Sequence, residues 1–181
     1  MPVAGCATTG LGVSPGSILA TVVANIPRSA DGGGGGSGGT ARTRARIPES
    51  PAPSSAAAHV LHTADAYVGV KYVWGGNTPS EGFDCSGFTK FVFAKYGIAL
   101  PRTAREQVRS GTAVARDFRA LIPGDIMLFA EPGQAISHVA IYAGNGRILH
   151  ASSAVGGVGY TDLNTGGEWF VQYFVAARRL L

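Results

Sequence analysis

The pattern of apolar positions changes near residue 58, and from there it predicts regular elements. Apolar side chains between residues 58 and 68 recur at helical spacing, at Val60, Leu61, Ala64 and Val68. Gly69 follows as a stop signal. This pattern predicts a first helix that packs one face on a core.

Two further helices are predicted downstream. Asp84 stands at an N-cap position before an apolar stripe, and Gly97 supplies a C-terminal stop, so a helix is expected from Cys85 to Tyr96. A capping box at residues 103–106 predicts a short helix that ends near residue 110.

The second half of the chain has the pattern of short strands separated by turns. The expected strands are 126–129, 137–142, 147–152 and 171–178, with turns at 123–125 and 143–146. Helices therefore come first and antiparallel strands follow with short connections. This order predicts an α+β domain whose helices pack on one side of an antiparallel sheet.

The first 57 residues lack any such pattern. A glycine-rich run at 31–39 has the composition of a flexible linker, and alternating arginines and prolines follow it. Such a segment buries too little apolar surface to offset the entropy lost on ordering it. We therefore expect residues 1–57 to be a disordered leader or tether and residues 58–181 to be the folded domain. No apolar stretch approaches the ~20 residues that a membrane-spanning helix needs.

Composition and charge narrow the class of partner. The chain has 181 residues, 45% of them hydrophobic, and a formal net charge of +4. This charge is too mild to indicate nucleic-acid binding, although it suits work near an anionic polymer such as a cell wall.

Cys85 is the first candidate for chemistry. It lies at the predicted start of a helix, where unpaired backbone N–H groups and the positive end of the helix dipole stabilise a thiolate. The same N–H groups can serve as oxyanion donors when a carbonyl is attacked. The alternative is a buried structural cysteine, which is common. The residues alone leave both interpretations open.

A cysteine nucleophile needs a base, and the domain offers four histidines. His59 and His62 lie on the first predicted helix and are expected to face solvent. His138 and His150 lie on neighbouring predicted strands, where with Cys85 they fit a nucleophile, a base and an orienting group. A lone strand histidine is usually structural. Zinc would need closely spaced ligand pairs, which these residues do not provide, so we expect no metal and no cofactor.

The turn between the two histidine strands decides whether the histidines share a face. A regular two-residue turn would put His138 and His150 on opposite faces. A three-residue loop would pair His150 with Ala140, so that both histidines share a face as diagonal neighbours. Gly146 suits the left-handed third position of such a loop. We therefore predict this loop, or a bulge with the same parity.

Several motifs, in order along the chain, resemble those of the NlpC-type peptidoglycan endopeptidases. Phe83-Asp-Cys-Ser-Gly87 resembles the signature around their catalytic cysteine. The other motifs are Tyr72-Val-Trp-Gly-Gly76, Pro101-Arg102 through Gln107, Pro123-Gly-Asp125 before an apolar strand, and residues 137–144 and 148–151. The resemblance runs from about His59 to about Arg179, which is nearly the whole predicted domain.

This resemblance implies a papain-like fold and a catalytic triad. Cys85 would be the nucleophile, His138 the general base and His150 the third member. The activity implied is hydrolysis of the bond between D-glutamate and diaminopimelate in peptidoglycan stem peptides. A thioester on the cysteine would be the intermediate.

The resemblance also implies substrate-binding roles for Tyr72, Asp84 and Ser86. These residues would lie near the substrate and recognise its polar end groups. The alternatives are that Asp84 is only a helix cap and that Tyr72 is only a packed loop aromatic.

Two other classes of function compete with the endopeptidase. One is a peptidoglycan-binding module that has lost activity, against which the retained triad residues argue. The other is an enzyme of different specificity, such as an amidase at the sugar–peptide junction. For the peptidase we expect an exported monomer, in the periplasm, anchored at the envelope or secreted, with peptidoglycan stem peptides as its partner and no nucleic acid.

Cys6 raises the question of an anchor. Val3-Ala4-Gly5-Cys6 resembles the end of a bacterial lipoprotein signal, whose cysteine receives a lipid after cleavage. A true signal has a charged start and an apolar run, whereas only Met1 and Pro2 stand before this match. Either translation starts upstream of Met1, or the match is accidental. With a lipid at Cys6, residues 7–57 would tether the enzyme to a membrane.

Overall fold

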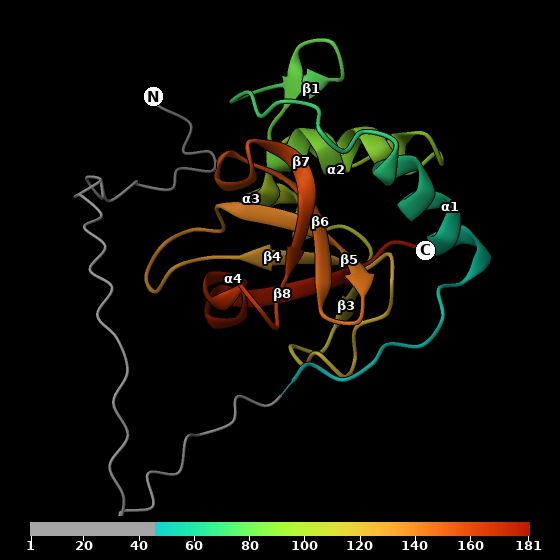
Figure 1. The fold of residues 1–181 in the computed structure, drawn as a ribbon, viewed down its shortest axis with the longest axis vertical. Coiled ribbons are helices and arrows are strands. Elements are labelled where there is room, and N and C mark those ends of the chain that lie inside the picture. Colours follow the sequence, from blue (N-terminus) through green and yellow to red (C-terminus); the bar gives the residue numbers. More distant parts are fainter. Residues whose placement is uncertain (1–45) are drawn as a thin grey trace, which may run out of the picture. The chain divides into compact units, whose positions relative to one another are not determined.

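The computed structural model describes residues 46–181, which form an α+β domain (Figure 1). The expected glycine-rich linker and the lipid anchor at Cys6 lie outside the described residues. The described part contains four α-helices, α1 (Ser55–Asp65), α2 (Cys85–Ala94), α3 (Ala104–Gln107) and α4 (Glu168–Tyr173), and one 3-10 helix, η1 (Ser153–Val155). Within residues 46–181, no helix is long and apolar enough to span a membrane.

A six-stranded antiparallel sheet is the centre of the domain, with strand order β3-β8-β4-β5-β6-β7. Its strands are β3 (Thr112–Val114), β4 (Ile126–Phe129), β5 (His138–Gly144), β6 (Arg147–Ser152), β7 (Gly157–Asp162) and β8 (Phe174–Arg179). A separate two-stranded ribbon, β1 (Asn77–Thr78) and β2 (Gly82–Phe83), precedes α2. The predicted α+β class is therefore confirmed.

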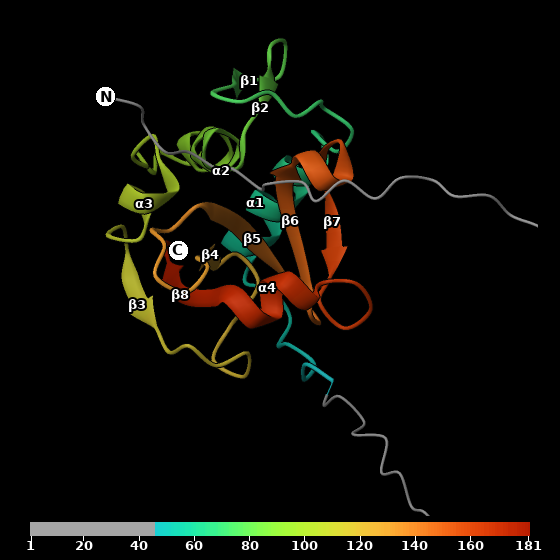
Figure 2. The same cartoon turned by 90° about the vertical axis from the view of Figure 1, so that its left-hand side faces the viewer.

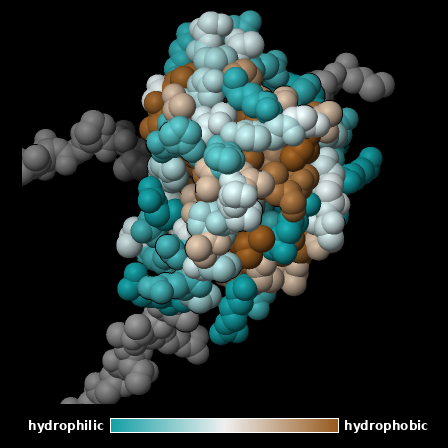
Figure 3. All heavy atoms as spheres, turned by 90° about the vertical axis from the view of Figure 1, so that its right-hand side faces the viewer, coloured by the Kyte–Doolittle hydropathy of each residue, from teal (hydrophilic) through white to brown (hydrophobic). Residues whose placement is uncertain are grey.

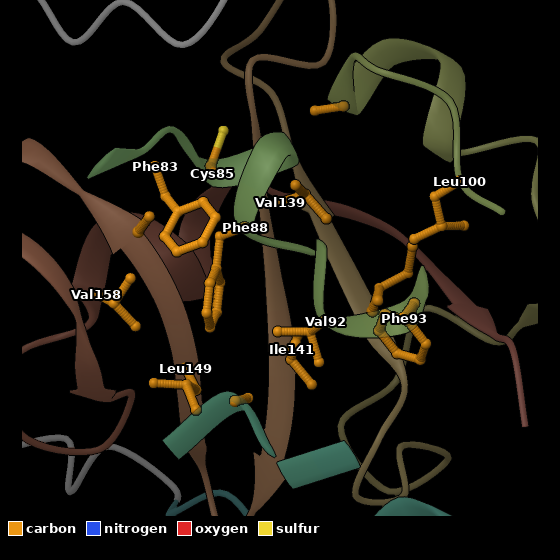
Figure 4. Packing of buried hydrophobic residues seen from close by; sticks show 14 of the residues in the cluster. Phe83, Cys85, Phe88, Val92, Phe93, Leu100, Val139, Ile141, Leu149 and Val158 are labelled. Atoms are coloured by element: carbon orange, nitrogen blue, oxygen red, sulfur yellow. The ribbon is translucent and has the colours of Figure 1, made fainter. Parts of the chain in front are cut away.

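The two faces of the sheet bury two different clusters. One face carries Val139 and Ile141 of β5 and packs against Phe88 and Val92 of α2 (Figure 4). The other face carries Ala140 and Tyr142, with Trp169 and Phe170 of α4 packed against that cluster. In Figures 1 and 2, α2 and α4 accordingly lie on opposite sides of the sheet. The predicted helix α2 therefore packs on one side of the sheet as expected, and α4, a helix that the sequence did not predict, covers the other side.

Residues 171–173 depart from the predicted last strand. They complete the helix α4, and the strand β8 begins only at Phe174. Valine and aromatic side chains favour strands, which explains the prediction. Here tertiary packing overrides propensity, because the rings of Trp169 and Phe170 lie 6.1 and 5.2 Å from the ring of Phe129.

The start of the folded region also differs from the prediction. Helix α1 begins at Ser55 rather than near residue 58, because the Ser54 hydroxyl caps it by accepting a hydrogen bond from the Ala57 N–H. Residues 46–53, which the sequence assigned to the leader, lie against the domain as an extended segment. We call this segment the strap.

The strap is held by hydrogen bonds to two loops far away in the sequence. The Ile47 N–H donates to Asn164 Oδ1 at 2.8 Å, and the Ser50 N–H donates to Asn145 Oδ1 at 2.9 Å. The Ser50 hydroxyl also lies 2.8 Å from the hydroxyl of Tyr142. The strap therefore braces the turn between β5 and β6.

Few large apolar side chains of the described residues are exposed. Those with more than a third of their surface exposed are Val68, Trp74, Tyr96, Val155 and Leu181. On the face drawn in Figure 3, apolar side chains are interspersed with polar ones. Trp74 precedes Gly75, whose N–H donates to the Asp84 carboxylate, so it lies near the start of α2.

Candidate active site

Cys85 is the first residue of α2, and its position is fixed by the cap before it. Asp84 adopts an extended conformation, and its Oδ1 accepts a hydrogen bond from the Gly87 N–H at 2.7 Å. Cys85 is buried, and its sulfur lies 4.0 Å from the carbonyl oxygen of Ser137, the residue before β5. Figure 4 shows this sulfur directed away from the rings of Phe83 and Phe88. The sulfur of Cys85 therefore lies beside the strand that begins with His138.

The start of α2 is pressed against the loop formed by residues 72–76. The Asp84 N–H donates to the Gly76 carbonyl at 3.2 Å. A Cβ atom at Gly87 would lie 2.1 Å from that same carbonyl oxygen, so only glycine fits there. Gly87 thus lets the backbone of α2 meet the backbone of this loop in the first turn of the helix.

The hairpin of β5 and β6 has the predicted parity but a different turn. Ile141 pairs with Leu149 and Tyr142 with Ile148, before a bulge shifts the register towards Gly144. The bulge is followed by two left-handed residues, Asn145 (φ 52°) and Gly146 (φ 72°). The three-residue loop is therefore replaced by a bulge with a two-residue turn, the second of the two predicted forms, and both histidines share a face.

His138 and His150 are joined by a hydrogen bond. His138 Nε2 lies 2.8 Å from His150 Nδ1, and His150 Nε2 lies 3.0 Å from the hydroxyl of Thr161 on β7. The ring of Phe170 lies 5.6 Å from the ring of His138 and 5.0 Å from that of His150. One aromatic side chain of α4 therefore covers the pair of histidines.

Burial sets the charge state of both histidines. It lowers the pKa of His150 from 6.5 to about 4. Burial also holds the pKa of His138 well below its usual range, and the neighbouring His150 lowers it further. Both rings are consequently neutral at pH 7, and a neutral imidazole can accept a proton. His138 can therefore act as a base.

A polar cluster surrounds the cap of α2. Arg102 donates from Nη1 to Asp84 Oδ1 at 3.0 Å and from Nη2 to Asp84 Oδ2 at 2.6 Å. Arg102 Nη1 also lies 3.0 Å from the hydroxyl of Ser86, and the Gly75 N–H donates to Asp84 Oδ2 at 3.0 Å. Both oxygens of Asp84 are thus occupied by groups of the chain itself.

Tyr72 belongs to the same cluster. Burial and the charge of Asp84 raise the pKa of its phenol, and the charge of Arg102 opposes them. The phenol is therefore protonated at neutral pH and can donate a hydrogen bond. The predicted substrate residues Tyr72, Asp84 and Ser86 are thus brought together at the start of α2. Arg102 joins them; it lies in one of the motifs found in the sequence, but no role was predicted for it.

Gln107 fixes the backbone behind this cluster. Its buried amide donates from Nε2 to the carbonyl oxygens of Ser86 and Pro101, at 3.0 and 2.9 Å. The amide therefore ties the first turn of α2 to the segment that carries Arg102.

The two other histidines of the domain, His59 and His62, are exposed on α1, as expected. Within residues 46–181, no group of three or more His, Cys, Asp or Glu side chains could hold a metal ion.

Comparison with known proteins identifies the family. Residues 69–179 match the NlpC/P60 family. The chain is 42% identical over 109 residues to the bifunctional muramidase/DL-endopeptidase CwlT of Bacillus subtilis. The matched region covers 59% of this chain and 32% of that protein. It is 37% identical over 131 residues to the gamma-D-glutamyl-L-lysine dipeptidyl-peptidase of Bacillus cereus, which covers 71% of this chain and 38% of that protein. The chain thus spans less than half the length of these relatives.

Solved structures show the same fold. A crystal structure of an NlpC/P60 family protein from Bacillus cereus superposes with a TM-score of 0.63 and 36% identity, covering 75% of this chain and 42% of that one. The NlpC/p60 domain of the peptidoglycan hydrolase SagA gives a TM-score of 0.56 and 32% identity, covering 68% of this chain and 97% of that one. The predicted papain-like fold is confirmed by this likeness.

Proposed function

The chain belongs to the NlpC/P60 family, and on that premise we propose that it is a cysteine peptidase that cleaves peptide bonds in peptidoglycan stem peptides. The observation that carries the proposal is the hydrogen bond between His138 and His150. The Cys85 sulfur lies close by, beside the residue that precedes His138 at the start of β5. A nucleophile, a neutral base and an orienting group are the parts that acyl transfer requires.

The proposed reaction uses the two nitrogens of His138 differently. Nε2 bonds to His150, so Nδ1 takes the proton of the Cys85 thiol as the sulfur attacks the scissile carbonyl carbon. The C–N bond then breaks, His138 gives the proton to the leaving amine, and a thioester remains on Cys85. Water, deprotonated by His138, adds to the thioester and releases the carboxylic acid and the thiol.

The first turn of α2 supports this reaction electrostatically. The N–H groups of the first turn of a helix lie at the positive end of its dipole. In α2 these groups belong to Cys85 and Ser86, next to the attacking sulfur. We assign them the stabilisation of the negative oxygen that forms when the carbonyl is attacked.

The polar cluster at the cap of α2 is the proposed site for the acyl side of the substrate. The Tyr72 phenol and the Ser86 hydroxyl supply neutral hydrogen-bonding groups, and Arg102 with Asp84 supplies a charge pair. Such a set suits a short peptide that ends in charged groups. The bond proposed is that between D-glutamate and diaminopimelate. The names of two relatives, a gamma-DL-glutamyl hydrolase and the gamma-D-glutamyl-L-lysine dipeptidyl-peptidase, support a D-glutamyl substrate.

Mass spectrometry of purified muropeptides after digestion tests this proposal. Wild-type protein should give one fragment that ends in D-glutamate and another that begins with diaminopimelate, and Cys85→Ala should give neither. An amidase would instead release the whole stem peptide from the sugar, and an inactive binding module would retain muropeptides without cutting them. His62→Ala, which changes an exposed histidine on α1, is the matched control and should retain wild-type cleavage.

The place of action follows from the substrate. Peptidoglycan lies outside the cytoplasmic membrane, so we propose that the protein is exported and acts at the cell envelope or beyond it as a monomer. Lipidation at Cys6 is a separate part of this proposal, which mass spectrometry of protein from its own host tests directly.

A further inference from the structure

His150 has a second partner, and that partner comes from a strand that the sequence did not predict. His150 Nε2 lies 3.0 Å from the Thr161 hydroxyl of β7, while its Nδ1 lies 2.8 Å from His138. The three side chains come from β5, β6 and β7, which are consecutive neighbours in the sheet. They form one hydrogen-bonded chain across these three strands.

The register of β6 and β7 produces this contact. His150 pairs with Gly159, and Ile148 pairs with Thr161. Alternate residues of a strand share a face, so Thr161 is the diagonal neighbour of His150 on the same face. A side chain at this position can therefore reach the outer edge of the imidazole.

Proton counting shows why the partner of His150 matters. A neutral imidazole carries one proton, on either Nδ1 or Nε2. For Nδ1 of His138 to accept the thiol proton, His138 must carry its own proton on Nε2 and donate it to His150. Nδ1 of His150 must then be unprotonated. The proton of His150 is therefore on Nε2, facing the Thr161 oxygen.

The opposite arrangement would disable the base. If His150 carried its proton on Nδ1, it would donate to Nε2 of His138, and His138 would hold its own proton on Nδ1. That nitrogen could then accept nothing from the thiol. Both histidines are buried, so a nearby protein group rather than bulk solvent should select between the two arrangements.

We propose that Thr161 is a positioning residue that selects the productive arrangement by accepting the Nε2 proton of His150. This inference rests on the proposed function for its consequence in activity, but not for its effect on the histidine tautomers. The Thr161 hydroxyl bonds to His150, so its influence on the reaction passes through that residue.

A purely structural role is the competing explanation, because threonine is favoured in strands by its branched shape alone. Thr161→Val separates the two, since it keeps the branched shape and removes only the oxygen. Thr161→Ser keeps the oxygen and removes the methyl group.

Nitrogen-15 NMR of the histidine rings in the full chain tests the tautomers directly. Wild type and Thr161→Ser should carry the proton on Nε2 of both His138 and His150. Thr161→Val should shift a measurable share of both rings to the Nδ1 form. Unchanged tautomers in Thr161→Val would overturn the proposal, whether or not the protein cleaves muropeptides. If Thr161→Val does not fold, Thr161→Ala takes its place with the same expected shift.

Kinetics of muropeptide cleavage supply the second readout. Thr161→Val should lower kcat about tenfold with little change in KM, as loss of one neutral hydrogen bond would, and Thr161→Ser should stay near wild type. In a His150→Ala background, Thr161→Val should cause no further loss, because the residue through which it acts is gone. An equal loss in both backgrounds would assign Thr161 to packing alone. Lack of activity in wild type would refute the proposed function and leave the NMR result to decide on Thr161.

Discussion

The guanidinium of Arg102 holds both carboxylate oxygens of Asp84, at 3.0 and 2.6 Å, and Asp84 in turn caps the helix that begins with Cys85. An arginine from the segment before α3 thus holds the first turn of α2. Because a lysine presents a single point charge instead of a planar fork, it cannot reproduce this contact.

Arg102→Lys is therefore expected to lower both stability and activity. The loss of the two-pronged contact should lower the free energy of unfolding by ~1–2 kcal/mol and reduce kcat/KM for muropeptides. Chemical denaturation and steady-state kinetics measure the two effects. Arg105→Lys, an exposed position on α3, is the control and should change neither. A fully stable and active Arg102→Lys would show that the bidentate geometry is unimportant.

Cys85 should be the site at which a thiol reagent inactivates the enzyme. In reduced protein, iodoacetamide is expected to abolish cleavage in step with carbamidomethylation of Cys85, and an excess of muropeptide should slow both events equally. Peptide mapping by mass spectrometry locates the modification. Inactivation without modification of Cys85 would place the nucleophile elsewhere.

Substitutions of the two histidines should have graded effects. His138→Ala should remove most of the activity because it deletes the base, whereas His150→Ala should cost less because His150 only orients the base. His150→Gln and His150→Asn should cost less again, since an amide oxygen can accept the hydrogen bond from His138. Wild-type activity in His150→Ala would reduce His150 to a packing residue. The kcat values of these variants decide the order.

Acid should destabilise the domain through His150 in a defined pH range. An unfolded histidine takes up a proton near pH 6.5, whereas folded His150 does so only near pH 4, because burial lowers its pKa. Between these values the unfolded state binds more protons, so the stability that neutral His150 contributes is lost as the pH falls from 6.5 to 4. This contribution is about 3 kcal/mol at most.

Urea titrations of wild type and His150→Gln across this pH range measure the effect. The variant should lose less stability than wild type between pH 6.5 and 4, because glutamine does not titrate there. Parallel curves for the two proteins would show that burial of His150 does not govern the acid response.

The strap should stabilise the domain although the sequence placed it in the leader. Deleting residues 1–53 removes the hydrogen bonds of Ile47 and Ser50, and should lower the free energy of unfolding by ~1–3 kcal/mol. Deleting residues 1–45 keeps these contacts and should have little effect. Thermal denaturation compares the two. Ser50→Ala should reproduce part of the loss, and exposed Glu49→Ala should reproduce none.

Local signals in the sequence were enough to predict the elements that carry the proposed triad. The Asp84 cap predicted the start of α2, and the glycines at 144 and 146 restricted the hairpin to a few registers. These features are determined by residues within a few positions of one another, so a single sequence reveals them.

Features that depend on distant contacts were not predicted. Strand β7 contains Gly157 and Gly159, which disfavour strands, and it forms because β6 offers a full set of backbone partners. Thr161 was therefore missed along with its strand. The strap was missed because Asn145 and Asn164, the residues that hold it, lie about a hundred positions away.

The bulge between β5 and β6 restricts how this hairpin can vary in length. Gain or loss of one residue between Tyr142 and Arg147 would turn either His138 or His150 to the opposite side of the sheet, yet it would leave the strands themselves able to pair. A change of two residues would preserve the orientation of both rings. Only insertions or deletions of an even number of residues in this turn would therefore preserve the proposed reaction. An odd insertion would give a folded protein in which the two histidines lie on opposite faces of the sheet.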